Sequence, residues 1–110
     1  MGAIAAEIER QVLSWPGVTA EPHRFGGMEF RFHGREIGHL HGDRLADLPF
    51  PVRVREELVA ARRAAPHHIF PESGWVSRSI SGEGDVNEVV ALFRMQYDRI
   101  AARENGVGQR

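Results

Sequence analysis

The chain has 110 residues, of which 42% are hydrophobic and 26% are charged, and its formal net charge is -1. This length fits one domain with one core. Because positive and negative charges nearly cancel, the protein has no overall positive potential that would attract a phosphate backbone, and nucleic acid is not an expected partner. The absence of cysteine excludes thiolate chemistry, disulfides and cysteine-ligated metal, and the absence of lysine excludes Schiff-base chemistry.

The N-terminal segment predicts a helix and no export signal. The stretch MGAIAAEIER has no basic flank, and no apolar run in the chain approaches the ~20 residues that span a bilayer. We therefore expect a cytoplasmic protein without a membrane partner. Ile4, Ile8, Val12 and Trp15 recur near one helical face, which predicts a helix over residues 3–14 that the following WPG ends.

A short extended piece over residues 18–25 is followed by a segment, residues 28–42, with the two-residue alternation of a β-hairpin. A two-residue turn at His33 and Gly34 is the predicted connection. The resulting pairs are Phe32 with Arg35, Arg31 with Glu36, Phe30 with Ile37 and Met28 with His39. This register predicts that His39 and His41 share the face of Phe30 and point inward.

The second half of the chain predicts helices separated by proline-rich segments. DRLADLPFP reads as a loop, residues 52–64 as a helix, PHHIFPESGW as a second loop and WVSRSI as a strand. Asp85 with Glu88 three residues later predicts a capping box at the start of the last helix. The expected fold is one α+β domain over residues 1–110, with a mostly antiparallel sheet, helices on one face, the order α-β-β-β-α-β-α and a frayed tail over residues 103–110.

The candidate site combines a histidine pair on a strand with a histidine pair in a loop. His39 and His41 fall on one strand face about 7 Å apart, and Asp43 follows them. His67 and His68 come from the proline-rich loop. We expect these side chains to line a pocket for a small-molecule ligand, with His39 or His41 as a general base that Asp43 orients.

Several alternatives remain open at this stage. The His-x-His pair could share a divalent metal with a carboxylate or a third imidazole, but we expect polar pocket walls, with no metal and no cofactor. The histidines could also only support the fold. Trp75 either forms a wall for a planar ligand or caps the core, and Arg24 either pairs with Asp43 or contacts an anionic ligand.

The same stretches resemble a known family. WPGVTAEPHRFGGMEFRFHGREIGHLHGDRLADLPFP, then PHHIFPESGWVS and a terminal LFRMQYDRI helix, are similar to the small bacterial proteins of the luciferase-domain family, over about residues 8–100. Fungal luciferase, which oxidises a hydroxylated styryl-pyrone with molecular oxygen, contains a related domain. Arg78 departs from the apolar or aromatic residue expected in that strand. The site residues that the resemblance implies are His23, Arg24, His39, His41, Asp43, His67, His68 and Trp75.

Two functions follow as hypotheses from this resemblance and from the histidines. The first is a cofactor-independent oxygenase acting on a small, conjugated ring compound that carries an acidic hydroxyl. Histidine, with an ordinary pKa of about 6.5, suits removal of such a proton near neutrality. The second is a binding module that captures a metabolite or a metal ion without turnover.

Overall fold

A computed structural model describes residues 2–23 and 26–105 of the chain. Its elements in this part of the chain are α1 (Ala3–Leu13), β1 (Val18–Pro22), β2 (Met28–Phe32), β3 (Arg35–His41), β4 (Leu45–Pro49), α2 (Val52–Ala60), β5 (Ala65–Pro66), β6 (Trp75–Ser79), the short 3-10 helix η1 (Glu83–Asp85) and α3 (Val86–Glu104).

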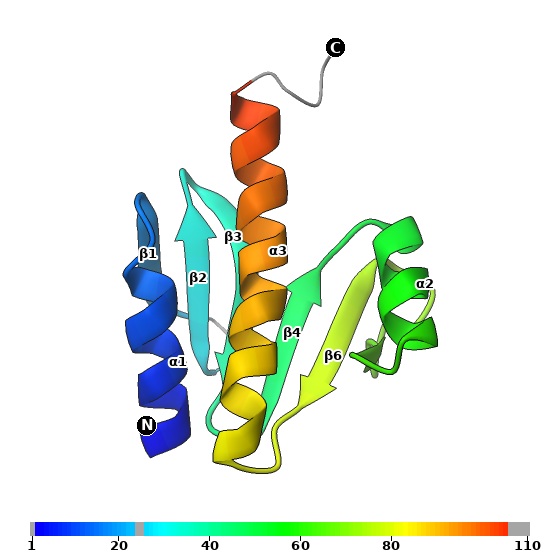
Figure 1. Ribbon diagram of the computed structural model, residues 1–110, viewed down its shortest axis with the longest axis horizontal. Coiled ribbons are helices and arrows are strands. Elements are labelled where there is room, and N and C mark those ends of the chain that lie inside the picture. Colours follow the sequence, from blue (N-terminus) through cyan, green and yellow to red (C-terminus); the bar gives the residue numbers. More distant parts are fainter. Residues whose placement is uncertain (1, 24–25, 106–110) are drawn as a thin grey trace.

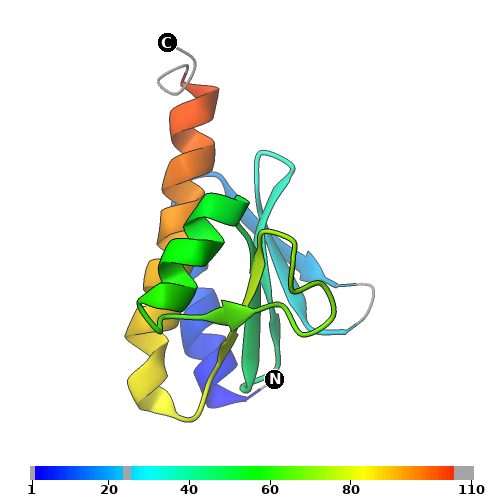
Figure 2. The same cartoon turned by 90° about the vertical axis from the view of Figure 1, so that its right-hand side faces the viewer.

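The strands of the described residues form one antiparallel sheet in the order β1-β2-β3-β4-β6-β5. The long helices α1, α2 and α3 lie on one side of this sheet, and the loop between β5 and β6 projects from the other side (Figures 1 and 2). The predicted α+β class, with its antiparallel sheet and its helices on one face, is therefore confirmed.

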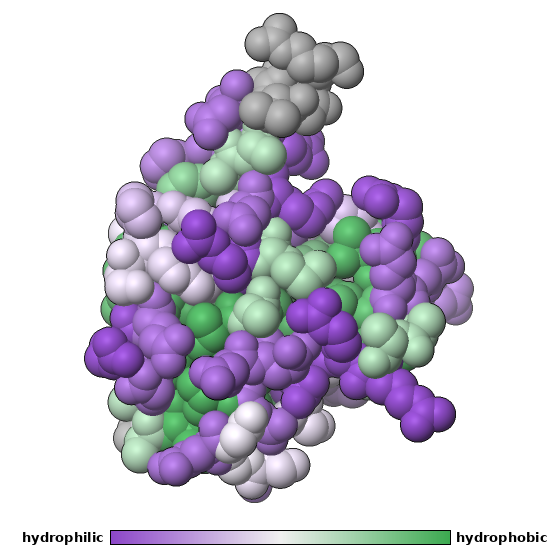
Figure 3. All heavy atoms as spheres, viewed as in Figure 1, coloured by the Kyte–Doolittle hydropathy of each residue, from purple (hydrophilic) through white to green (hydrophobic). Residues whose placement is uncertain are grey.

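The hydrophobic core lies between this sheet and the helices. Ile8 and Val12 of α1 and Phe93 of α3 are fully buried there, because each helix turns one apolar stripe to the sheet. The outward sides of the helices are mostly hydrophilic, with apolar atoms visible mainly in the furrows between them (Figure 3). Within the described residues, no helix combines the length and the apolar character needed to cross a bilayer.

The β2–β3 hairpin departs from the predicted register after its second pair. The turn at His33 and Gly34 is confirmed, as are the pairs of Phe32 with Arg35 and Arg31 with Glu36. Beyond them Ile37 is an extra residue, a β-bulge, so Phe30 lies opposite Gly38 and Glu29 lies opposite His39.

The bulge reverses the predicted orientation of the histidines. One extra residue moves every later side chain to the opposite face of the sheet. The prediction that His39 and His41 share the face of Met28, Phe30 and Phe32 is therefore wrong. Leu40 enters the core instead, and both histidines face the side of the sheet without helices.

The segment predicted as a loop, DRLADLPFP, contains the central strand β4. Its residues Ala46, Asp47 and Leu48 are all buried, because β4 pairs with β3 on one side and β6 on the other. Pro49 is the last residue of the strand and lies opposite Trp75 of β6. The two-residue strand β5 at the sheet edge was also not predicted.

The start and the end of α3 differ from the sequence prediction in detail. Asp85 forms no side-chain cap; its carboxylate accepts hydrogen bonds from the Ser81 N–H and from Arg78. The same contact explains why an arginine is accommodated in β6, since Arg78 also reaches the carbonyl oxygen of Arg63. The helix continues through Glu104, so residues 103 and 104 belong to it and not to a frayed tail; residues 106–110 lie outside the described residues.

The close packing of α3 on the bulge leaves no space for a side chain at position 38, which is glycine. A Cβ atom added at Gly38 would lie 2.8 Å from the Asp47 carbonyl oxygen and 2.9 Å from the Phe93 ring. We expect Gly38→Ala to lower the free energy of unfolding by about 1–3 kcal/mol, measured by urea denaturation. The matched control is Gly84→Ala, where nothing lies within 4 Å of the new Cβ. Equal stabilities of the two variants would contradict this account of the packing.

Candidate functional site

A cavity of about 500 Å³ opens on the side of the sheet without helices. It is lined by His23, Glu36, His39, His41, Asp47, His67, His68, Ile69, Phe70 and Trp75. The strand histidines and the loop histidines, which are far apart in the sequence, therefore meet as predicted, and His23 and Trp75 join them. Arg24, a further predicted ligand contact, lies outside the described residues.

Asp47 is the centre of this cluster. Its carboxylate is only 1% exposed, and its Oδ1 accepts a hydrogen bond of 2.6 Å from the Ser77 hydroxyl. Its Oδ2 lies 3.0 Å from Nε2 of His41, 3.5 Å from Nε2 of His39 and 3.6 Å from Nε2 of His67. Burial raises the pKa of this carboxyl, but the hydrogen bonds from His39, Ser77 and His41 hold the pKa well below its usual range. Asp47 is therefore a buried anion.

His39 is held between two carboxylates. Its Nδ1 lies 2.7 Å from Oε2 of Glu36, and its Nε2 faces Asp47. Burial alone would lower the pKa of His39, but the hydrogen bonds with Asp47 and Glu36 raise it to about 9. His39 is therefore a charged imidazolium near neutral pH, and each of its two N–H groups faces a carboxylate.

His41 has a different hydrogen-bonding state. Nε2 of His41 bonds with Asp47 at 3.0 Å, and among the described residues no hydrogen bond to its Nδ1 is found. An imidazole that donates Nε2–H to a carboxylate keeps its lone pair on Nδ1. His41 is also only partly buried, so this nitrogen is open to a bound molecule or to water.

The β5–β6 loop is folded around the ring of His67. Nδ1 of His67 accepts hydrogen bonds from the backbone N–H groups of Ile69 and Phe70, at 3.1 and 3.2 Å. Burial lowers the pKa of His67, which keeps this ring neutral with its proton on Nε2. Ile69 and Phe70, the second and third residues after His67, line the cavity and are 63% and 60% exposed.

Flat rings line the rest of the cavity. The Trp75 ring lies 5.5 Å from the His39 ring and 5.9 Å from the His67 ring, measured between centroids. His23 stacks on His39 at 4.1 Å, and His68 stacks on His67 at 4.4 Å. Aromatic surfaces at these spacings suit a planar, apolar molecule.

Asp43 lies elsewhere in the fold. Its Oδ1 accepts a hydrogen bond of 2.7 Å from the Ala5 N–H in the first turn of α1, where the helix dipole favours an anion. The carboxylates that contact His39, His41 and His67 are Asp47 and Glu36, neither of which was predicted. The signal for Asp47 was present in the alternation of Ala46, Leu48 and Phe50, which is typical of a strand and places Asp47 on the face opposite the core.

Two groups of side chains in the described part of the chain have the spacing of a metal site. The ligand atoms of His39, His41 and Asp47 lie within 4.8 Å of one another, and so do those of Asp47, His67 and His68. Each group has one obstacle. His39 would have to lose its proton, and Nδ1 of His67 already accepts two backbone hydrogen bonds, so its Nε2 carries a hydrogen and has no lone pair for a metal.

The comparisons with known proteins give one match. A family model described as Luciferase domain matches residues 34–96, the segment that contains β3, β4, the β5–β6 loop and most of α3. No curated protein and no solved structure matches the chain. The matched segment is more than half of the chain and carries every cavity residue except His23. The chain belongs to the luciferase-domain family.

Proposed function

We propose that the cavity binds a small, planar, conjugated ring compound with an acidic hydroxyl group, and that His41 removes the hydroxyl proton. The contact between Asp47 Oδ2 and His41 Nε2, at 3.0 Å in a cavity with aromatic walls, carries this proposal. The proposed partner is a small molecule and not nucleic acid, and the proposed location is the cytoplasm.

His41 is chosen as the base because of where the protons lie on the three histidines around Asp47. His39, as an imidazolium, carries a hydrogen on each nitrogen and has no lone pair to accept another proton, and His67 has its lone pair engaged by two backbone N–H groups. Of these three histidines, His41 is the one whose hydrogen bonds leave a nitrogen available. A base must be within hydrogen-bond reach of the proton that it takes, and His41 lines the cavity.

The charges of the cluster support proton transfer to His41. The imidazolium of His39 offsets one of the two carboxylates, Glu36 and Asp47, and leaves one negative charge. That charge stabilises the imidazolium that forms when His41 accepts the proton, as the aspartate of a catalytic triad does for its histidine. Asp47 thus takes the orienting role that the sequence suggested for Asp43.

The oxygenase form of the proposal adds molecular oxygen as the oxidant. The hydroxyl proton passes to His41, and a carbon of the resulting ring anion forms a C–O bond with O2. The terminal oxygen of the new peroxide then takes the proton back from His41, so the ring is oxidised to a hydroperoxide and O2 is reduced. The resemblance to the domain of fungal luciferase supports this choice of oxidant.

Oxygen uptake with a panel of hydroxypyrones and phenols tests this reaction. With a compound that turns over, we expect His41→Gln to lower kcat by about 10²- to 10⁴-fold, the usual contribution of a general base, while the compound still binds. The matched control is His33→Asn, which removes an exposed imidazole in the β2–β3 turn, at a positive φ that asparagine tolerates. This control is expected to leave uptake unchanged.

Two results would favour the alternative, a binding module without turnover. Binding of panel compounds without oxygen uptake would leave capture of a metabolite as the function. Stoichiometric metal in untagged protein, lost in the His39→Ala, His41→Ala double variant, would make the cluster a metal site, which the convergence of His39, His41 and Asp47 permits geometrically. Failure of every panel compound to bind would contradict the proposal itself.

A further inference from the structure

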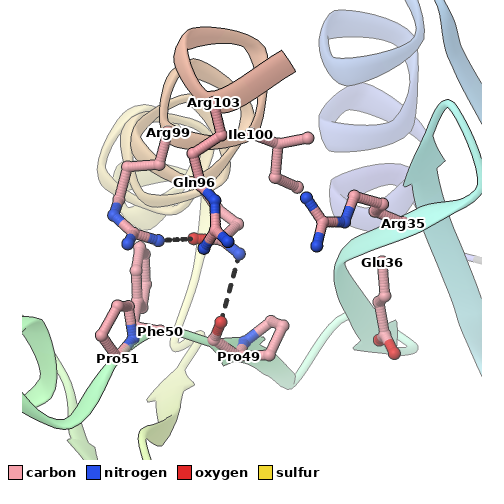
Figure 4. A pocket seen from close by; sticks show the side chains of 9 residues that line it. All are labelled: Arg35, Glu36, Pro49, Phe50, Pro51, Gln96, Arg99, Ile100 and Arg103. Atoms are coloured by element: carbon pink, nitrogen blue, oxygen red, sulfur yellow. Dashed lines mark hydrogen bonds between the residues drawn. The ribbon is translucent and has the colours of Figure 1, made fainter. Parts of the chain in front are cut away.

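A second cavity, of about 400 Å³, lies at the C-terminal end of α3. Figure 4 shows Arg99 and Arg103 extending into it from α3 and Arg35 reaching toward them from the start of β3. Pro49, Phe50 and Pro51 line the opposite side. This arginine cleft is separate from the histidine cavity, although Glu36 lines both.

Two of the arginines of this cleft, Arg35 and Arg99, have no carboxylate partner in the described part of the chain. Glu36, the one acidic residue among the described residues that line the cleft, has its Oε2 hydrogen-bonded to His39. In a chain of net charge -1, such a concentration of arginine is a local feature and not a property of the whole surface.

The cleft also holds one guanidinium in place before any ligand binds. Nη1 of Arg99 donates to Oε1 of Gln96 at 3.1 Å, and Nε2 of Gln96 donates to the Pro49 carbonyl oxygen at 3.1 Å (Figure 4). Burial and then the charges of Arg103 and Arg53 lower the pKa of Arg99. Like charges crowded in this way repel one another, and an anion between them would relieve the repulsion.

We propose that the arginine cleft is a binding site for the phosphate dianion of a phosphomonoester. Guanidinium groups bind such an oxyanion through paired, parallel N–H···O hydrogen bonds, and arginines from a strand and from a helix approach it from different directions. The dipole of the α3 C-terminus attracts cations and could account for Arg103, but Arg35 is in β3 and needs another explanation. The apolar side formed by Phe50 and its neighbouring prolines suits the organic part of the ester.

Nuclear magnetic resonance of the full chain, titrated with inorganic phosphate and with phenyl phosphate, tests the site. We expect the side-chain Nε–H signals of Arg35, Arg99 and Arg103 to shift, and the affinity to fall as salt is raised. Arg35→Gln and Arg99→Gln are each expected to weaken binding about tenfold or more, because each removes charge-assisted hydrogen bonds. Arg99→Lys keeps the positive charge but lacks the paired N–H donors of the guanidinium, and it is expected to bind more tightly than Arg99→Gln but less tightly than the unmodified protein.

The matched control is Arg44→Gln, which removes one exposed arginine at the turn after β3, at the far end of that strand from Arg35. It is expected to bind phosphate like the unmodified protein. Vesicles of phosphatidylcholine with phosphatidic acid form a second arm: binding to them without binding of phenyl phosphate would identify a lipid headgroup as the source of the phosphate. Undiminished phosphate affinity in the Arg35→Gln, Arg99→Gln double variant, or phenol binding as tightly as phenyl phosphate, would overturn the proposal.

Discussion

Replacing Asp47 with asparagine is expected to lower the free energy of unfolding by about 3–5 kcal/mol at neutral pH, as removal of one partner from a buried ion pair does. The carboxylate is almost completely buried, and Nε2 atoms of His41, His39 and His67 face its Oδ2. An asparagine amide cannot balance the charge of His39. Urea denaturation measures the loss, and a titration of the His39 signals by nuclear magnetic resonance should show its pKa falling from about 9.

Two variants make the Asp47 result interpretable. Asp98→Asn removes an exposed carboxylate that pairs with Arg94 on α3, and it is expected to change stability by less than about 1 kcal/mol. Ser77→Ala keeps the charge of Asp47 but removes the hydrogen bond to its Oδ1, which should lower stability by about 1 kcal/mol. If Asp47→Asn were no more damaging than Asp98→Asn, the carboxylate would not be a buried ion-pair partner.

The stability of metal-free protein is expected to rise as the pH falls from about 9 to about 6.5. The pKa of His39 is raised in the folded state to about 9 from 6.5, so its contribution is fully present below pH 6.5 and is lost as the pH rises through 9. The difference corresponds to about 3 kcal/mol. The chain has no lysine, so no lysine titrates on the alkaline side of this range.

Below about pH 6.5 the stability is expected to fall again. The pKa of His67 is lowered by burial, so the unfolded chain binds a proton there that the folded protein does not. At still lower pH, protonation of Asp47 removes the remaining charge pairing, because its pKa is also lowered. Urea denaturation at a series of pH values, with EDTA present, measures the profile. In His39→Gln, the decrease in stability between pH 6.5 and 9 should be absent. A stability that does not change over this range in the unmodified protein would contradict the contact of His39 with two carboxylates.

Short-range patterns in the sequence were sufficient for much of the fold. The helical stripe of α1, the turn at His33 and Gly34, and the apolar stripe of α3 each depend on residues within one element, and all three are confirmed. The position of β4 depended on its neighbours. Asp47 and Pro49 disfavour a strand locally, and only pairing with β3 and β6, with three imidazoles around Asp47, makes this segment the centre of the sheet.

The sequence brought together several of the residues that line the cavity, but not the carboxylates that contact them or their geometry. The meeting of His39 and His41 with His67 followed from the expectation that loops and strand ends gather functional groups. Which carboxylate contacts them did not follow, because Asp43 is closer in sequence to His41, whereas the pairing of β3 with β4 places Asp47 opposite His39 and within hydrogen-bond distance of His41. Hydrogen bonds that fix the protons, such as those of Glu36 and the loop backbone, depend on atomic positions that no residue pattern specifies.

Because Ile37 is an extra residue in β3, the number of residues between Arg35 and His39 decides on which face of the sheet the histidines lie. Deleting a single residue between Arg35 and His39 would remove the offset, turn His39 toward α3 and bring Leu40 out among the polar groups. A change of two residues would preserve which side each later residue occupies. Insertions or deletions in this segment, whether natural or designed, should therefore involve an even number of residues if the chain is to retain its histidine cavity.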